Sequence, residues 1–339
     1  MERIMKRVAL LMFACGMLAG CDKVRMTGSE IVFQASSAPT STRTAYSGER
    51  TSDSGAVKER IDWVPEDRIT VWSDKARTLD NAPYQDYIIK TVETDDDRIR
   101  SRATVKATGD NGLLWEPALG PYTFYARYPG DQDKLDGDKM TAAIPATQTL
   151  LYDSESGAIR PDMQYAFMFA KATAPVDAEK VLLPFAPVFT ALEFEVGGGG
   201  NGQVDLTSFK LTSTTDAITG SFEVACATGT ASLTGTPGLT ASLDFSNLPN
   251  GKLTVTGTTP VTVTLFGVPK DLKNLTLEVK GDQILTRTLK LSDKNGNMLK
   301  FDACKKYRLL GLSLPELLKA EGEDVDWDIQ AIGEPLIWD

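Results

Sequence analysis

The feature that most limits the fold of this chain is a succession of short segments in which apolar and polar residues alternate. Examples are residues 68–72, 122–128 and 189–196. Alternation with a period of two, together with β-branched and aromatic residues, is typical of strands that bury one face. Helical periodicity is nearly absent, and residues 315–320 are the best candidate for a helix. The sequence therefore predicts an all-β protein.

Turn residues separate most of these segments, and Asn250-Gly251 and Asn295-Gly296 are expected to form hairpin turns. Many short strands joined by such turns favour two antiparallel β-sandwiches. The alternation weakens near residue 175, where a Lys-Ala-Thr-Ala-Pro stretch ends. We therefore expect an N-terminal domain over residues 61–175 and a C-terminal domain over residues 176–339.

The first 20 residues have the pattern of a secretory signal peptide. A basic start precedes an apolar run over residues 8–18, which is too short to span a bilayer. Small residues lead directly into Cys21, and this ending resembles the bacterial lipoprotein signal, in which the cysteine is lipidated and becomes the first mature residue. The alternative is a secreted protein in which Cys21 is incidental. Asp22 leaves open which membrane would hold the lipid, because its effect differs between bacterial lineages.

A strand and a linker follow the leader, so residues 21–60 form a separate N-terminal segment. Residues 30–36 alternate, which places Ile31 and Phe33 on one face. Residues 37–60 are rich in Ser, Thr, Gly and Ala, as expected of an exposed linker. This linker carries three arginines at which a trypsin-like protease would cut, namely Arg43, Arg50 and Arg60.

Charge and residue usage exclude several function classes. The net charge is −10, and removing the leader takes away three basic residues and one acidic residue, which leaves −12. This charge opposes binding to nucleic acid. The chain has no histidine, which excludes Ser-His-Asp and Cys-His nucleophiles and HExxH metal sites. We expect no enzyme, no cofactor and no metal site.

Carboxylate-only chemistry survives the absence of histidine, since a glycosidase needs two carboxyl groups at a defined separation. The chain has 46 acidic residues, so candidate pairs are too numerous for any one to carry meaning. We therefore name no catalytic residue. Cys226 and Cys304 remain after the leader and the lipidation site are set aside, and they are either a disulfide or two buried thiols.

Two segments match ligand-binding motifs only formally. The acidic loop at residues 130–139 has Gln132 and Lys134 where an EF-hand needs oxygen ligands, which favours a solvated loop. Residues 197–202 satisfy GxGxxG, but an alternating segment follows them instead of a helix. No helix N-terminus is then available for a pyrophosphate, and a hairpin loop is the better interpretation.

The C-terminal tail combines acidic and apolar residues. Residues 316–339 hold eight acidic residues and one lysine. A disordered acidic tail would not normally carry two tryptophans and several aliphatic residues. The apolar positions are Trp327, Ile329 and Ala331 on one face of an expected strand, and then Leu336, Ile337 and Trp338. This segment packs either on its own domain or on another molecule.

The order of these features resembles the fimbrillins, the type V pilins and related surface lipoproteins of Gram-negative anaerobes, over most of the mature length. The matching motifs are Cys21; Thr42-Arg43-Thr44; Ile61-Asp62-Trp63; Asp67-Arg68-Ile69-Thr70-Val71-Trp72; Phe124-Tyr125-Ala126-Arg127-Tyr128-Pro129; Ile144-Pro145-Ala146-Thr147-Gln148-Thr149; Phe185-Ala186-Pro187-Val188-Phe189 with Leu192-Glu193-Phe194; Leu211-Thr212-Ser213 to Ile218-Thr219-Gly220; and Lys306-Tyr307 before Leu312.

This resemblance implies two tandem transthyretin-like β-sandwich domains and a structural pilus subunit without catalysis. Such pilins are exported as lipoproteins to the outer membrane and cell surface, and an arginine-specific protease cuts them in the early linker. The cut removes the first strand, and a strand of a neighbouring subunit fills the groove. By analogy, Ile31 and Phe33 are the inward residues of the removable strand, and Arg43 is the favoured cut site. The tail residues from Trp327 to Trp338 are the donor candidates, although Pro335 interrupts one long strand.

The implied partners are other copies of the chain or related pilus subunits, together with the outer membrane through lipid on Cys21. An anchor or a tip subunit of the same fibre is the nearest alternative. A surface glycan-binding lipoprotein is a further one, for which Trp63, Trp72 and Trp115 would have to be exposed platforms.

Overall fold

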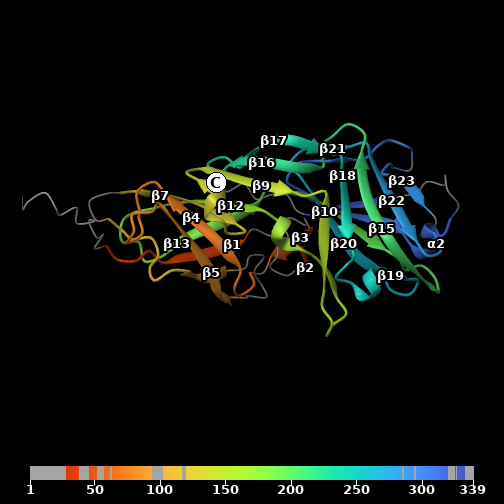
Figure 1. The fold of residues 1–339 in the computed structure, drawn as a ribbon, viewed down its shortest axis with the longest axis horizontal. Coiled ribbons are helices and arrows are strands. Elements are labelled where there is room, and N and C mark those ends of the chain that lie inside the picture. The colour runs from red at the N-terminus through yellow and green to blue at the C-terminus, as the bar shows by residue number, and fades with distance from the viewer. Residues whose placement is uncertain are drawn as a thin grey trace, which may run out of the picture.

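The computed structural model describes residues 28–37, 46–51, 57–61, 63–93, 102–116, 120–284, 286–293, 295–319, 325 and 327–332. The described part is built almost entirely of strands, so the expectation of an all-β protein is confirmed. In Figure 1 the elements lie in an elongated arrangement, with the early strands at one end and the late strands at the other. The specific arrangement as two transthyretin-like sandwiches stays a prediction.

Seven strands close a barrel at the N-terminal end, in the order β1-β13-β12-β7-β4-β5-β6. Their bounds are β1 Phe33–Ser37, β4 Arg68–Ser73, β5 Tyr84–Glu93, β6 Arg102–Ala107, β7 Tyr122–Tyr128, β12 Met168–Ala174 and β13 Val181–Pro187. Alternation explains the inside of this barrel, because Tyr122, Phe124 and Ala126 of β7 are all fully buried.

Three further sheets build the rest of the molecule. The largest has the order β11-β10-β18-β15-β22-β23 with β19 also paired to β15, the second is β20-β14-β25-β26, and the third is β17-β16-β9-β8. Their bounds are β8 Leu135–Asp136, β9 Lys139–Ile144, β10 Thr147–Tyr152, β11 Ile159–Pro161, β14 Thr190–Val196, β15 Gln203–Ser213, β16 Thr219–Ala225, β17 Thr230–Gly238, β18 Thr240–Asp244, β19 Leu253–Thr256, β20 Val261–Gly267, β22 Leu275–Gly281, β23 Arg287–Lys290, β25 Lys306–Leu312 and β26 Asp328–Ile332.

Short elements complete the fold. Two-stranded pairs are formed by β2 Tyr46–Thr51 with β3 Val57–Ile61 and by β21 Leu272–Lys273 with β24 Lys300–Phe301. The 3-10 helices are η1 Gln132–Lys134, η2 Met163–Tyr165 and η3 Pro249–Gly251. The expected C-terminal helix is present as α2 Leu314–Leu317, and the Ser313 hydroxyl at its N-cap accepts a hydrogen bond from the backbone N–H of Glu316.

Two of the expected hairpins turn out differently. Asn250 and Gly251 do adopt positive φ angles of 58° and 66°, but the strands on either side, β18 and β19, both pair with β15 and not with each other. The glycine-rich loop before residue 203 likewise connects β14 in one sheet to β15 in another. Local turn chemistry was therefore predicted correctly, whereas strand partners depend on the sheet as a whole.

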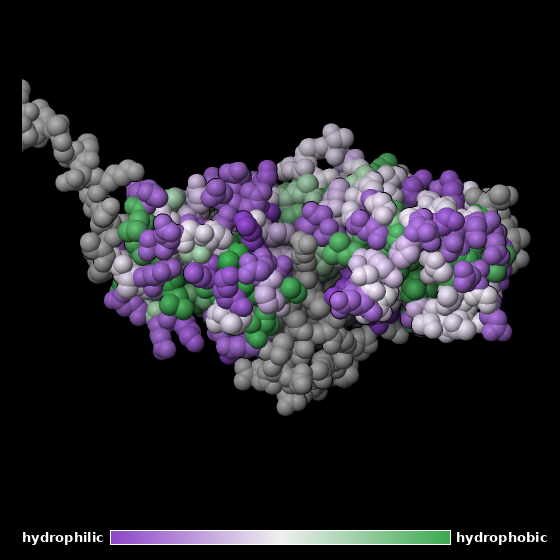
Figure 2. All heavy atoms as spheres, turned by 60° about the horizontal axis from the view of Figure 1, so that its bottom comes forward, coloured by the Kyte–Doolittle hydropathy of each residue, from purple (hydrophilic) through white to green (hydrophobic). Residues whose placement is uncertain are grey.

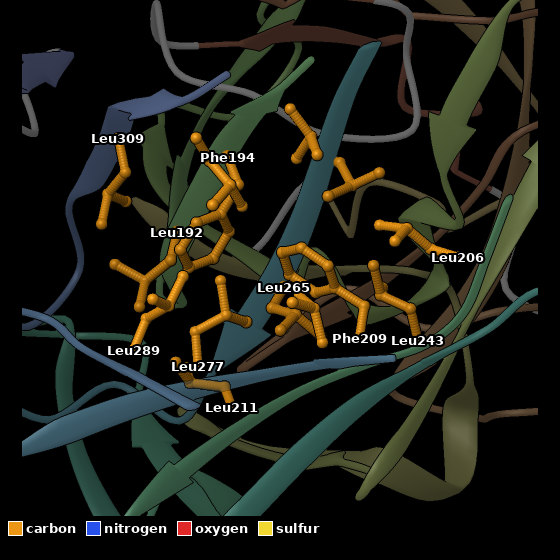
Figure 3. Packing of buried hydrophobic residues seen from close by; sticks show 14 of the residues in the cluster. Leu192, Phe194, Leu206, Phe209, Leu211, Leu243, Leu265, Leu277, Leu289 and Leu309 are labelled. Atoms are coloured by element: carbon orange, nitrogen blue, oxygen red, sulfur yellow. The ribbon is translucent and has the colours of Figure 1, made fainter. Parts of the chain in front are cut away.

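Three hydrophobic clusters hold these sheets together. One fills the barrel, and the largest lies between the two big sheets, where Leu192, Phe194, Phe209 and Leu277 meet (Figure 3). The third cluster joins the barrel to the rest, since it contains Phe167 from the approach to β12 together with residues of β9, β14 and β16. This third cluster therefore packs the barrel against the neighbouring strands β9, β14 and β16.

Strand pairing does not follow the expected boundary at residue 175. The strand β13 lies beyond that residue and pairs with β1 and β12 of the barrel. In the opposite direction, β9 pairs with β16, and β10 pairs in parallel with β18. Division into domains at residue 175 stays a prediction.

A buried amide links β10 of the largest sheet to β20 of the neighbouring sheet. The Gln148 side chain on β10 donates to the carbonyl oxygen of Phe266 at 2.7 Å, and its own oxygen accepts from the Phe266 N–H at 2.8 Å. Gln148 is only 2% exposed. The amide thus takes the place of a neighbouring strand for one residue of β20, and it satisfies two backbone groups that would otherwise be buried without partners.

We expect Gln148→Leu to lower the free energy of unfolding by about 2 kcal/mol or more, because it leaves the backbone groups of Phe266 unpaired. Chemical denaturation followed by fluorescence measures this change. Gln283→Leu is the control, since Gln283 is exposed and donates a single hydrogen bond to the Gln203 carbonyl oxygen. Equal losses in the two variants would contradict the proposed linking role.

Candidate functional site

The strand β1 closes the barrel, although it comes from the first described residues of the chain. It pairs in parallel with β13 and antiparallel with β6. The residues before it continue the contact, since the Ile31 N–H donates to the Leu113 carbonyl oxygen and the Val181 N–H donates to the Val32 carbonyl oxygen, both at 2.9 Å. Without β1, the barrel would have two open strand edges.

The inward face of this segment is apolar and completely covered. Ile31 and Phe33 are each 2% exposed and Ala35 is 0% exposed, whereas Val32 between them is 52% exposed. The Phe33 ring packs edge-to-face against the rings of Tyr87 and Phe124, at centroid distances of 5.3 and 5.1 Å. Residues 31–35, called the plug segment below, therefore insert alternate side chains into the barrel core.

Burial also affects the tyrosine beneath β1. Desolvation raises the pKa of Tyr87 above its ordinary value, and its hydroxyl bonds to the Leu113 N–H at 2.9 Å. This interaction ties the loop beside β1 to the floor of the barrel.

The C-terminal strand β26 lies at the edge of a sheet and pairs antiparallel with β25 of the same chain. Trp327, just before β26, is 5% exposed. Its ring lies 6.0 Å from that of Phe194, and its indole N–H donates to the Lys290 carbonyl oxygen at 3.0 Å. In this structure residues 327–332 of the tail thus pack on their own chain.

A buried charge cluster holds β25 to β14. Lys306 and Arg308 both contact the Glu193 carboxylate, each with a nitrogen–oxygen distance of 2.5 Å. The side chains of Glu193 and Lys306 are 3% and 1% exposed. Because buried charges need partners, this cluster fixes the strand against which β26 packs.

The family comparison agrees with this architecture. A family model described as fimbrillin-like matches residues 50–314. The chain belongs to the fimbrillin-like family. A search of curated protein sequences gives no match.

Two solved structures share the fold of this fimbrillin-like chain at low sequence identity. A proposed cell adhesion protein from Bacteroides uniformis has 12% identity and a TM-score of 0.52, over 89% of this chain and 97% of that one. Another from Bacteroides ovatus has 17% identity and a TM-score of 0.52, over 92% of this chain and 100% of that one. These similarities establish the fold alone.

The structure describes only some of the predicted site residues. Ile31 and Phe33 lie in or beside β1, and Trp327 and Ile329 lie beside or in β26. Ala331 of β26 pairs with Tyr307 of β25. Arg50 and Arg60 lie in β2 and β3. Five of the predicted site residues lie outside the described residues, namely Cys21, Arg43, Leu336, Ile337 and Trp338.

The tryptophans proposed as glycan platforms are not exposed. Trp63 and Trp115 are each 2% exposed and pack edge-on against other rings of the barrel cluster. Trp72 is half-buried against Tyr125. Trp63 and Trp115 thus serve as core residues and Trp72 is partly covered, which removes the observation behind that version of glycan binding.

Searches for other chemistry within the described residues give little. That part of the chain contains no group of three or more acidic or Cys side chains placed to hold a metal ion. Among the same residues, no helix is long and apolar enough to cross a bilayer.

Both cysteines of the folded body are thiols. Cys226 is buried and Cys304 is half-buried. Burial raises the pKa of Cys226 to about 12 and that of Cys304 to about 11. Of the two states that the sequence left open, the structure has the unpaired one.

We expect neither thiol to react with a disulfide reagent in the folded protein near about pH 8, because the thiolate is the reactive form. Both should react in denaturant. Because folding raises both pKa values, the two thiols contribute fully to the free energy of unfolding below their unfolded pKa. This contribution is lost as the pH rises from about 9 towards 12. Rapid labelling of the native protein would contradict this prediction.

The plug segment, residues 31–35, should stabilise the barrel through its buried side chains. Phe33→Ala in the intact chain should lower the free energy of unfolding by about 3–5 kcal/mol, since it leaves a cavity beside Tyr87 and Phe124. Val32→Ala on the same segment should change it by less than about 0.5 kcal/mol. Denaturant unfolding of both variants measures the difference, and similar losses would show that the inward face does not stabilise the barrel.

Proposed function

We propose that this chain is a structural subunit of a type V pilus that assembles by strand exchange. Its membership of the fimbrillin-like family supports a non-enzymatic role in a fimbrium at the cell surface. The two solved proteins with the same fold, both described as proposed cell adhesion proteins, agree with a contribution to adhesion. Export as a lipoprotein, with lipid on Cys21 in the outer membrane, belongs to the same proposal.

The observation that carries strand exchange is a sequence match between the two ends of the chain. Residues 31–35 read Ile-Val-Phe-Gln-Ala and residues 327–331 read Trp-Asp-Ile-Gln-Ala. The positions that face inward in the first segment are large apolar, large apolar and Ala, and the second segment repeats this series. A strand with the same alternation, running in the same direction, fills the same pockets.

Exchange begins when a protease cuts the linker at Arg43, or at Arg50 or Arg60, and β1 leaves the barrel. The opened groove between β13 and β6 then takes the C-terminal strand of a neighbouring subunit. In that register Trp327 replaces Ile31, Ile329 replaces Phe33, and Ala331 replaces Ala35.

Exchange also has a cost, because β26 must leave its own sheet. Trp327 would lose its contact with Phe194 and its hydrogen bond to Lys290. The groove offers comparable burial, on the order of 1.5–3 kcal/mol for each large apolar side chain. Leu336, Ile337 and Trp338 are the alternative donor, which would leave β26 in place.

A peptide spanning residues 325–332 tests the register directly. It should bind to the chain from which the fragment ending at Arg43 has been removed, and not to the uncut chain, as measured by fluorescence anisotropy. The control peptide exchanges Trp327 with Asp328 and Ile329 with Gln330, which moves the apolar side chains to the other face. The control should bind at least about tenfold more weakly. Equal binding of both peptides, or binding to the uncut chain, would contradict the proposed register.

The role in the fibre has its own test. In mass spectrometry of the chain taken from cells, a start at Thr44 supports a stalk subunit, whereas lipid retained on Cys21 supports an anchor subunit. In sizing chromatography, the processed chain should form polymers, and deletion of residues 327–339 should prevent them. A processed chain that stays monomeric would refute the stalk role, in favour of an anchor or tip subunit.

A further inference from the structure

The N-terminal segment that closes the barrel makes backbone contacts before β1 begins. The Ile31 N–H donates to the Leu113 carbonyl oxygen and the Trp115 N–H donates to the Ser29 carbonyl oxygen, both at 2.9 Å. Residues 29–31 therefore run antiparallel to residues 113–115. The groove that the departure of β1 would open extends as far as this loop.

Glu30 is the single acidic residue between positions 28 and 37, and its carboxylate binds a backbone N–H of the same loop. Its Oε1 atom accepts from the Gly112 N–H at 3.0 Å. Gly112 is buried, whereas the Glu30 side chain is otherwise exposed, so the contact lies at the rim of the groove. Among the described residues, Glu30 is the acceptor for this N–H.

The contact depends on close approach to the backbone of a glycine. A Cβ atom added at Gly112 would lie 2.7 Å from the Glu30 Oε1 atom and 2.8 Å from the Tyr87 hydroxyl oxygen. The next N–H, that of Leu113, is bonded to the Tyr87 hydroxyl at 2.9 Å and so stays satisfied without the N-terminal segment. Removal of that segment therefore uncovers the Gly112 N–H and takes away its acceptor, and an unpaired N–H in a groove that is filled again is costly.

Apolar alternation alone would select an incoming strand poorly. Many segments of this chain alternate, and β7 is one of them. On the face shown in Figure 2, hydrophobic residues form small separate patches among hydrophilic ones, so that face offers no continuous apolar surface to a strand. Specificity is a difference between affinities, and a donor that needs an anionic acceptor penalises strands that lack one.

The C-terminal tail has an acidic residue at the corresponding place in its sequence. Residues 30–35 read Glu-Ile-Val-Phe-Gln-Ala, and residues 326–331 read Asp-Trp-Asp-Ile-Gln-Ala. Both segments thus have a carboxylate directly before the first large apolar residue, and both end in Gln-Ala. In the register proposed above, Asp326 takes the position of Glu30.

We propose that the barrel groove recognises a carboxylate of the strand that fills it, through the N–H of Gly112. In the uncut chain this carboxylate belongs to Glu30, and in the assembled fibre it belongs to Asp326 of a neighbouring subunit. The second assignment rests on the proposed strand exchange, whereas the Glu30 contact does not. Hydrogen bonds to a charged acceptor are stronger than neutral ones, so the groove favours an acidic residue at this position.

Variants of the peptide spanning residues 325–332 test this recognition by fluorescence anisotropy with the chain from which the fragment ending at Arg43 has been removed. Asp326→Asn should weaken binding about threefold to tenfold, as expected for one weakened hydrogen bond. Asp326→Glu should bind more tightly than the unchanged peptide, because it restores the side-chain length of Glu30. Asp328→Asn is the matched control, since it removes the same charge at the position of Val32, which is 52% exposed, and it should leave the affinity unchanged.

The intact chain tests the Glu30 contact without strand exchange. Glu30→Ala should speed hydrogen exchange of the Gly112 amide several-fold, as measured by NMR, because the amide loses its acceptor. Asp110→Ala is the control, since Asp110 is an exposed carboxylate two residues from Gly112 in the same loop. It should leave that exchange rate unchanged.

Each outcome decides one of the two assignments. An unchanged Gly112 exchange rate in Glu30→Ala would overturn the recognition of a carboxylate. A loss for Asp328→Asn that equals or exceeds the loss for Asp326→Asn would overturn the role of Asp326. If no tail peptide binds while Glu30→Ala speeds exchange, the proposed strand exchange fails and the recognition of Glu30 is supported.

Discussion

The structure depends on the closure of the N-terminal barrel by a strand that is distant in sequence from its neighbours. The strand β1 lies between β13 and β6, and no other described segment fills that position. Its inward residues reach Tyr87 and Phe124, which are themselves central to the barrel cluster. A barrel closed by a terminal strand is complete only while that strand, or an equivalent one, is present. Under the proposed strand exchange, a strand of another subunit would therefore enter at the N-terminal end.

Near the C-terminal end, β26 and the preceding Trp327 repeat the alternation of residues 31–35. The tail forms β26 on its own sheet, and the cluster of Glu193, Lys306 and Arg308 fixes the strand on which it packs. Strand exchange would then trade one set of main-chain hydrogen bonds and buried side chains for another of the same kind. Because the gains and losses are similar, the proteolytic cut that frees the groove would control assembly.

Between these ends, strand crossing makes the molecule mechanically continuous. The barrel contains β13 from the second half of the chain, and the distal sheets contain β9 and β10 from the first half. A third hydrophobic cluster packs the barrel against the distal sheets, and the amide of Gln148 joins two of those sheets to each other.

The sequence by itself determined where most strands and turns lie, and which side chains of a strand share one face. Alternation placed Ile31 and Phe33 on one face of a strand, because period-two patterning is a local property, and in the structure that face is buried. It did not identify Arg127 or Glu193, which alternate with inward residues and would face solvent in a sheet with one buried side. Tertiary structure decided their burial, since a second sheet packs over β7 and buried neighbours surround both faces of β14. Strand partners and the closure of the barrel likewise arise from contacts between residues far apart in sequence, which no local pattern specifies.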